Sequence, residues 1–169
     1  HPKAPRYSCY SDHFNGQPTY KIGMKVPWPA AGPNKTYIGG GYSHLLRGER
    51  FLHLWLDKHG YKYDVITDRD LDSNPDILDG YKVVCINGHS EYWSGRAYDG
   101  LDRYLKGGGA AVVMSGNTMF WRVSFDGTGE VMECRKFGKS IGGRARAKVG
   151  ELYHSHDFKR GSLMRFCGY

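Results

Sequence analysis

The chain has 169 residues and carries 24 lysines and arginines against 17 aspartates and glutamates, a formal net charge of +7. Its apolar fraction of 40% and charged fraction of 24% are those of a folded globular protein, and no apolar run approaches the roughly 20 residues of a membrane span. Much of the positive charge lies in residues 135–150, which hold few aromatic residues. This pattern favours a solvated or subunit-facing surface over a nucleic-acid partner.

The first 43 residues are rich in turn formers and show no clear period. A free loop of this length is uncommon, so we predict an ordered arm or cap over residues 1–43 and a domain over residues 44–169. The start has neither the apolar core of a signal peptide nor an initiator Met, so we expect a processed or incomplete piece of a longer chain. The four cysteines form no CxxC pair, which favours a reducing, cytoplasmic setting with Cys85 buried in a strand.

The hydrophobic pattern becomes regular from Glu49 onward. Residues 49–60 predict a helix that ends at Gly60, with one apolar face made of Phe51, Leu52, Trp55 and Leu56. Residues 61–67 predict a strand, and residues 68–81 predict a turn with one short helix.

Two apolar runs with a helix between them form the centre of the predicted fold. Residues 82–87 and 110–115 predict strands that are apolar throughout. Residues 94–107 predict a helix capped by Ser94 that buries Tyr98, Leu101 and Leu105 and stops at Gly107. Uniformly apolar strands joined through a helix indicate an α/β fold with a mostly parallel open sheet that helices cover on both sides.

Shorter strands follow toward the C-terminus. The segments "MFWRVSF" (119–125), "EVMECRKF" (130–137) and "GELYHS" (150–155) are separated by glycine-containing turns. This spacing predicts a small antiparallel extension of the domain.

Polar side chains follow the two central strands where each strand ends. The first strand runs into "NGHSEYW", with His89 and Glu91, and the second runs into "SGNTMFW", with Asn117. Ligands of open parallel sheets bind beyond the carboxyl ends of the strands, so we expect these three side chains to face one crevice. A neutral imidazole accepts a proton from water, a carboxylate donates oxygen to a metal, and an amide steadies an oxyanion.

Ser90 offers a different chemistry as a nucleophile in a strand–turn–helix elbow. That motif needs small residues on both sides of the serine, whereas Glu91 and Tyr92 follow Ser90. The sequence therefore disfavours serine catalysis.

The stretch "VVCINGHSEYWSGRAYDGLDRYLKGGGAAVVMSGNTMFWRV" resembles the large (beta) subunit of N,N-dimethylformamidase and its relatives. The resemblance continues through "FLHLWLDKHGYKYDVITDRDL", "GELYHSHDFKRGSLMRF" and "SCYSDHFNG". It implies a class I glutamine-amidotransferase-like fold and hydrolysis of a formamide to formate and an amine. It also implies a mononuclear ferric ion, Fe(3+), held by two tyrosinates and a glutamate.

The family's site residues fall on four positions of this sequence. The resemblance implies that Glu91 and Tyr10 are metal ligands, with Tyr7 as the competitor for Tyr10, and that His89 and Asn117 are catalytic. It places a second tyrosine ligand before residue 1 and a further catalytic glutamate after Tyr169. It further implies a small-molecule formamide substrate, a small helical partner subunit and homo-oligomerisation.

Two other functions remain open from the sequence. The chain is then either a non-catalytic α/β subunit or scaffold module, or a metal-free hydrolase that uses His89 and Glu91 as an acid/base pair. Neither the exact substrate nor the oligomeric state follows from the residues.

Overall fold

A computed structural model describes residues 21–25, 46–116, 118–119, 121–134, 140–141 and 144–145. The chain divides into two compact units. The α/β unit spans 26–91 and 96–118, and the β-rich unit spans 1–25, 92–95 and 119–169. None of the helices within the described ranges is long and apolar enough to cross a membrane.

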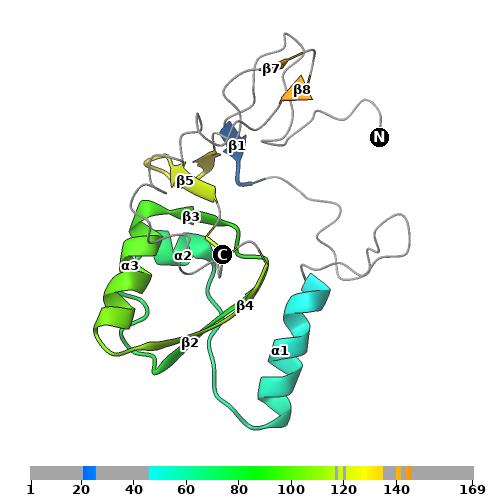
Figure 1. Ribbon diagram of the computed structural model, residues 1–169, viewed down its shortest axis with the longest axis vertical. Helices are drawn as coiled ribbons and strands as arrows, with labels where there is room; N and C mark the ends of the chain where they lie inside the picture. Colours follow the sequence, from blue (N-terminus) through cyan, green and yellow to red (C-terminus); the bar gives the residue numbers. More distant parts are fainter. Residues whose placement is uncertain are drawn as a thin grey trace. The chain divides into compact units, whose positions relative to one another are not determined.

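Two parallel strands joined through a helix form the centre of the α/β unit (Figure 1). Strand β2 (Val83–Gly88) pairs in parallel with β4 (Ala110–Ser115), in a register from Val83 beside Ala110 to Gly88 beside Ser115. Helix α3 (Gly95–Lys106) connects them, and it begins directly after Ser94. The prediction that these two strands are parallel neighbours is confirmed.

Helix α3 supplies much of the buried apolar surface of this unit. Ala97, Tyr98, Leu101 and Tyr104 are buried, which confirms the prediction for Tyr98 and Leu101, whereas Leu105 is only half-buried. Gly100 lies against the turn that follows α2, because a Cβ there would stand 2.8 Å from the Pro75 carbonyl oxygen. Arg103 donates to that same oxygen at 2.9 Å.

Helix α1 (Leu46–Lys58) forms as predicted, and Gly60 follows it at φ +71°. Phe51 and Trp55 on its apolar face are 73% and 50% exposed. Two other predictions for this unit are wrong. Residues 61–67 form no strand; Asp57 and Asp64 accept hydrogen bonds there from the tyrosine hydroxyls of Tyr63 and Tyr81. Cys85 is a free, exposed thiol rather than a buried one.

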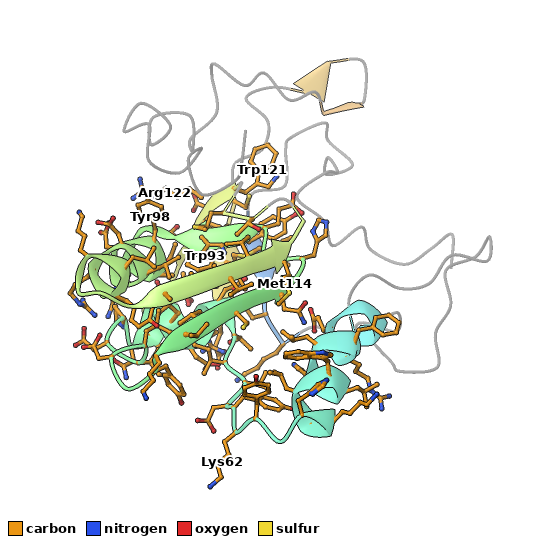
Figure 2. The ribbon with its side chains drawn as sticks, turned by 60° about the horizontal axis from the view of Figure 1, so that its bottom comes forward. Lys62, Trp93, Tyr98, Met114, Trp121 and Arg122 are labelled. Atoms are coloured by element: carbon orange, nitrogen blue, oxygen red, sulfur yellow. The ribbon has the colours of Figure 1, made fainter. Side chains whose placement is uncertain are left out.

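The central strands are also more open than their composition predicts. Val83, Val112, Val113 and Met114 are each 44–50% exposed, and Figure 2 shows the Met114 side chain on β4. Among the described residues β2 and β4 pair only with each other. Because strand side chains point to the two faces of a sheet, this exposure means that the described elements leave parts of both faces uncovered.

The β-rich unit contains a mixed four-stranded sheet in the order β1-β6-β5-β3. Its strands are β1 (Lys21–Gly23), β3 (Tyr92–Ser94), β5 (Trp121–Phe125) and β6 (Val131–Glu133). The β1/β6 and β5/β6 pairs are antiparallel, and β3/β5 is parallel. Trp121, Val123 and Cys134 form its core, and β7 (Ser140–Ile141) and β8 (Arg144–Ala145) form a separate antiparallel pair.

The fold is therefore α/β, but the described strands do not form one mostly parallel sheet. The antiparallel extension is confirmed for β5 and β6, while "GELYHS" lies outside the described residues. Tyr92–Ser94, for which no strand was predicted, form β3, because their backbone pairs in parallel with β5.

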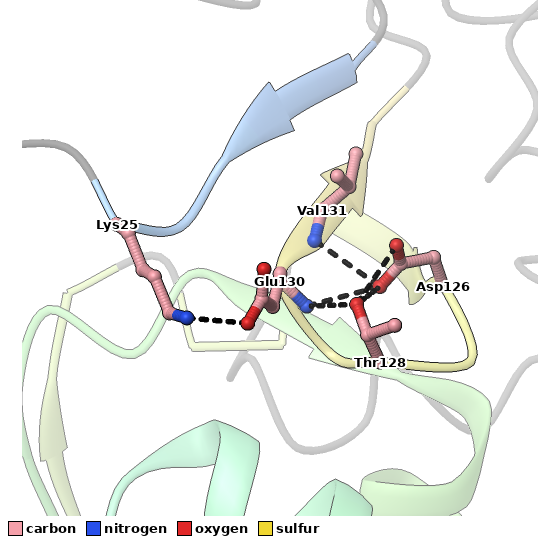
Figure 3. Close-up of polar contacts among 5 residues, drawn as sticks. All are labelled: Lys25, Asp126, Thr128, Glu130 and Val131. Carbon is pink, nitrogen blue, oxygen red and sulfur yellow. Dashed lines mark hydrogen bonds and ion pairs between the residues drawn. The ribbon is translucent and has the colours of Figure 1, made fainter.

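The turn between β5 and β6 is held by the Asp126 carboxylate (Figure 3). Asp126 Oδ1 accepts from the backbone N–H groups of Glu130 at 2.9 Å and Val131 at 3.2 Å, and from the Thr128 hydroxyl at 3.0 Å. Lys25, which follows β1, forms an ion pair with Glu130. These contacts explain why the "DGTG" segment reverses the chain here.

Helix α2 (Asp68–Ser73) begins with a capping box, and we expect removal of this capping box to lower the stability of the fold. The Thr67 hydroxyl accepts from Asp70 N–H at 3.2 Å, and the Asp70 carboxylate accepts from Thr67 N–H at 2.8 Å. We expect Thr67→Ala to lower the free energy of unfolding by about 1 kcal/mol at pH 7. Urea unfolding would measure this, with Ser73→Ala at the other end of α2 as the control.

The same capping box predicts that the free energy of unfolding depends on pH. Hydrogen bonds from the Thr67 backbone and side chain hold the pKa of Asp70 below its usual 3.8. A lowered native pKa stabilises the fold above the unfolded-state value, and that contribution is lost as the pH falls through the native pKa. The difference between wild type and Thr67→Ala should therefore shrink between pH 7 and pH 3, and a constant difference would contradict this account.

Candidate active site

The turn of residues 89–91 follows β2 at the edge where β4 also ends. Because Gly88 pairs with Ser115, the carboxyl ends of both strands lie side by side. The backbone N–H of Gly116 donates to the Gly88 carbonyl at 3.2 Å, which joins the two chain segments just beyond the strands. Residues from both strand ends are thus brought together, as the sequence predicted.

His89 and Glu91 face each other across this turn. His89 Nδ1 lies 3.5 Å from Glu91 Oε2, and the two side chains are 26% and 11% exposed. A carboxylate beside Nδ1 favours the proton on that nitrogen and leaves Nε2 free of a proton in the neutral ring.

Gly116 provides the space that the His89 ring occupies. A Cβ at residue 116 would stand 2.9 Å from His89 Nε2 and 3.0 Å from its Cδ2, which is closer than carbon atoms normally approach. The imidazole therefore lies over the backbone that follows β4, one residue before Asn117.

Gly88 lets the chain turn out of β2. Its φ of +75° lies in the left-handed region that favours glycine, and Glu49 of α1 lies where a Cβ would stand. Asn87 Nδ2 donates to the Glu49 carbonyl at 3.0 Å, so the first turn of α1 contacts the end of β2.

Ser90 anchors the turn to two other segments of the chain through two hydrogen bonds. Its N–H donates to Ser115 Oγ at 2.7 Å, and its hydroxyl donates to Asp68 Oδ1 at 2.8 Å. Ser115 is also hydrogen-bonded to Thr118, whose hydroxyl donates to the Ser115 carbonyl at 3.0 Å. The serine hydroxyl therefore acts as a donor to a carboxylate in this structure.

The sequence analysis missed Asp68 and Ser115 as parts of this site. Burial raises the pKa of the Asp68 carboxyl, the hydrogen bond from Ser90 acts to lower it, and the negative charge of Glu49 raises it. No spacing rule links Asp68 to Ser90; the only local signal was the position of Asp68 directly after a helix cap, which is commonplace.

Three residues that the resemblance assigns to the site or names as a competitor, Tyr7, Tyr10 and Asn117, are outside the described residues. Trp93 and Trp121 are 4% and 7% exposed and belong to the β-rich unit (Figure 2). Within the part of the chain that is described, no three His, Cys, Asp or Glu side chains are grouped to hold a metal.

A sequence profile described as "N,N-dimethylformamidase beta subunit-like, C-terminal" matches residues 6–168. The chain belongs to this family. Two relatives, both called N,N-dimethylformamidase beta subunit, come from Alcaligenes sp and Paracoccus aminophilus. Each is 31% identical over 163 residues, which is 94% of this chain.

The chain spans 21% of the length of each of these dimethylformamidase relatives. The match includes the turn of His89 and Glu91 and the edge formed by β2 and β4, since both lie within residues 6–168.

Proposed function

We propose that this chain forms part of an iron-dependent amidohydrolase that converts N-substituted formamides, such as dimethylformamide, to formate and an amine. The observation that carries the proposal is the contact between His89 and Glu91 at the shared edge of β2 and β4. The family membership of residues 6–168 supports the substrate class.

In this proposal His89 is the general base. The carboxylate of Glu91 beside Nδ1 orients the ring, and Nε2 takes a proton from the attacking water. The water oxygen forms a bond to the formyl carbon, and the C–N bond then breaks. The proton held at Nε2 goes to the departing nitrogen, so that formic acid and a neutral amine result, and the acid then loses its proton to solvent to give formate.

Asn117 is proposed to donate its amide N–H to the formyl oxygen as negative charge develops there. Its neighbour in the sequence, Gly116, lies against the His89 ring, which supports this assignment. A single donor of this kind typically contributes about 3 kcal/mol to lowering the barrier.

Glu91 fits a hard trivalent cation by its chemistry. It offers a carboxylate oxygen at the edge of the sheet and is only 9% exposed, so water competes little for it. Together with Tyr10 it would hold Fe(3+), with remaining ligands from outside this chain. Ferric iron, when bound, supplies positive charge that acidifies water and polarises a carbonyl group.

The proposal extends to the wider fold, the partners and the location of the protein. Parallel sheets are usually covered on both faces, and the 44–50% exposure of Val83, Val112 and Val113 supports further layers of a glutamine-amidotransferase-like domain. A small helical subunit and homo-oligomerisation would suit relatives that are called beta subunits. The exposed free thiol of Cys85 supports a reducing cytoplasm.

The deciding experiment is the iron content of the native protein and of Glu91→Gln. The substitution keeps the side-chain shape but removes the anionic ligand, so we expect bound iron to fall at least tenfold, since even residues behind a metal ligand are worth 10–100-fold. Glu133→Gln on β6, a half-buried glutamate of the β-rich unit, is the control and should keep its iron. Tyr10→Phe should weaken the visible phenolate-to-iron absorption.

The alternatives predict different results. Native protein that hydrolyses formamides without iron, yet depends on His89 and Glu91, would replace this proposal by a metal-free acid/base hydrolase. Iron-free protein without hydrolase activity would leave a scaffold module.

A further inference from the structure

We propose that Asp68 is a positioning residue that holds the His89–Glu91 pair in place through Ser90. This inference rests on the proposed function, because it assigns Asp68 a task in the same site. Neither residue touches the reacting atoms in this account: Asp68 acts only on Ser90, and Ser90 acts through its two neighbours in the chain.

The first ground is that the three side chains of the turn have different partners. His89 and Glu91 contact each other at 3.5 Å, whereas the Ser90 side chain between them reaches Asp68 at 2.8 Å. Fixing Ser90 therefore fixes the stretch of backbone from which both functional groups extend.

The second ground is that Ser90 is held from two elements at once. Its hydroxyl donates to Asp68 on α2, and its N–H donates to Ser115 Oγ at the end of β4 at 2.7 Å. Ser90 is 8% exposed, so water cannot easily replace either bond. With one bond to the backbone and one to the side chain, the residue can neither rotate nor shift without breaking one of them.

The third ground is the placement of Asp68 itself. The capping box of Thr67 and Asp70 fixes the first turn of α2, and Asp68 is the first residue of that helix. Its carboxylate lies in a half-buried position beside Glu49, where solvation is poor and a second negative charge is near. A carboxylate kept under such conditions suggests a specific acceptor role rather than a surface charge.

The test is a double-mutant cycle on the native protein, with iron affinity and turnover as readouts. Asp68→Ala and Ser90→Ala each remove one side of the bond, and each is expected to weaken iron binding or lower kcat by about 10- to 100-fold. Because both act through one bond, the double variant should lose little more than either single variant. Asp72→Ala, a half-buried aspartate on the same helix, should stay near wild type.

Rescue separates positioning from a general loss of stability. Asp68→Asn still accepts a hydrogen bond from Ser90 and removes a charge that burial disfavours, so its loss should remain below about fivefold. KM should change little in all variants, because positioning acts on the chemical step. Thermal unfolding of each variant, measured in parallel, confirms that the protein assayed is folded.

The outcomes are distinct. If the wild-type protein is active and Asp68→Ala and Ser90→Ala have wild-type kcat and iron affinity, the positioning role is overturned and the proposed function stands. The positioning role is also overturned if the fold-losses of kcat or iron affinity in the two single variants multiply in the double variant. The same holds if Asp68→Asn loses as much as Asp68→Ala. Wild-type protein that neither binds iron nor hydrolyses formamides overturns the proposed function and this role with it.

Discussion

His89→Ala is expected to lower kcat for formamide hydrolysis by about 10²- to 10⁴-fold, the usual contribution of a positioned general base. The imidazole lies between Glu91, 3.5 Å from Nδ1, and the backbone of Gly116. Its removal leaves the attacking water without a proton acceptor, whereas the side chain is 26% exposed and contributes little to the core. Steady-state kinetics of the native protein and the variant would measure the loss.

His89→Gln separates the base from a purely structural role. Glutamine retains a polar side chain that is able to bond Glu91, but it does not accept a proton at neutral pH. We therefore expect a loss nearly as large as that of the alanine variant. His59→Ala, an exposed histidine just after α1, is the matched control and should remain active. A His89→Gln protein with wild-type kcat would refute the general-base role.

The meeting of the two strand ends was predictable because it depends on local patterns. Two uniformly apolar runs, with one amphipathic helix of 12 residues between them, permit few arrangements other than a parallel crossover. Once β2 and β4 are neighbours, the residues that follow Gly88 and Ser115 must share an edge.

The hydrogen bond from Ser90 to Asp68 was not predictable, because it depends on the fold and not on a local pattern. Asp68 reaches Ser90 across 22 residues, through a short helix whose direction depends on the packing of the turn at Pro75 against α3. Nothing in the local pattern around Asp68 distinguishes it from Asp70 or Asp72, and only the fold shows that its carboxylate faces the turn.

The errors in the N-terminal part of the α/β unit share one physical cause. The alternation of residues 61–67 and the apolar face of α1 describe what these segments are able to bury, but burial needs a partner surface. In the structure Val65 is 66% exposed and Phe51 73% exposed, and the tyrosine–aspartate hydrogen bonds near them are local. Composition predicts the capacity for burial and not the partner that would provide it.

Leu101→Ala is expected to lower the free energy of unfolding of the α/β unit by about 2–5 kcal/mol. Leu101 is 1% exposed in α3, next to Gly100, which lies against Pro75, so the neighbouring backbone has little room to fill the cavity. Leu101→Met, which conserves volume, should cost less than about 1.5 kcal/mol. Hydrogen exchange of the α3, β2 and β4 amides would report this unit separately from the β-rich unit, and equal losses in the two variants would contradict a cavity as the cause.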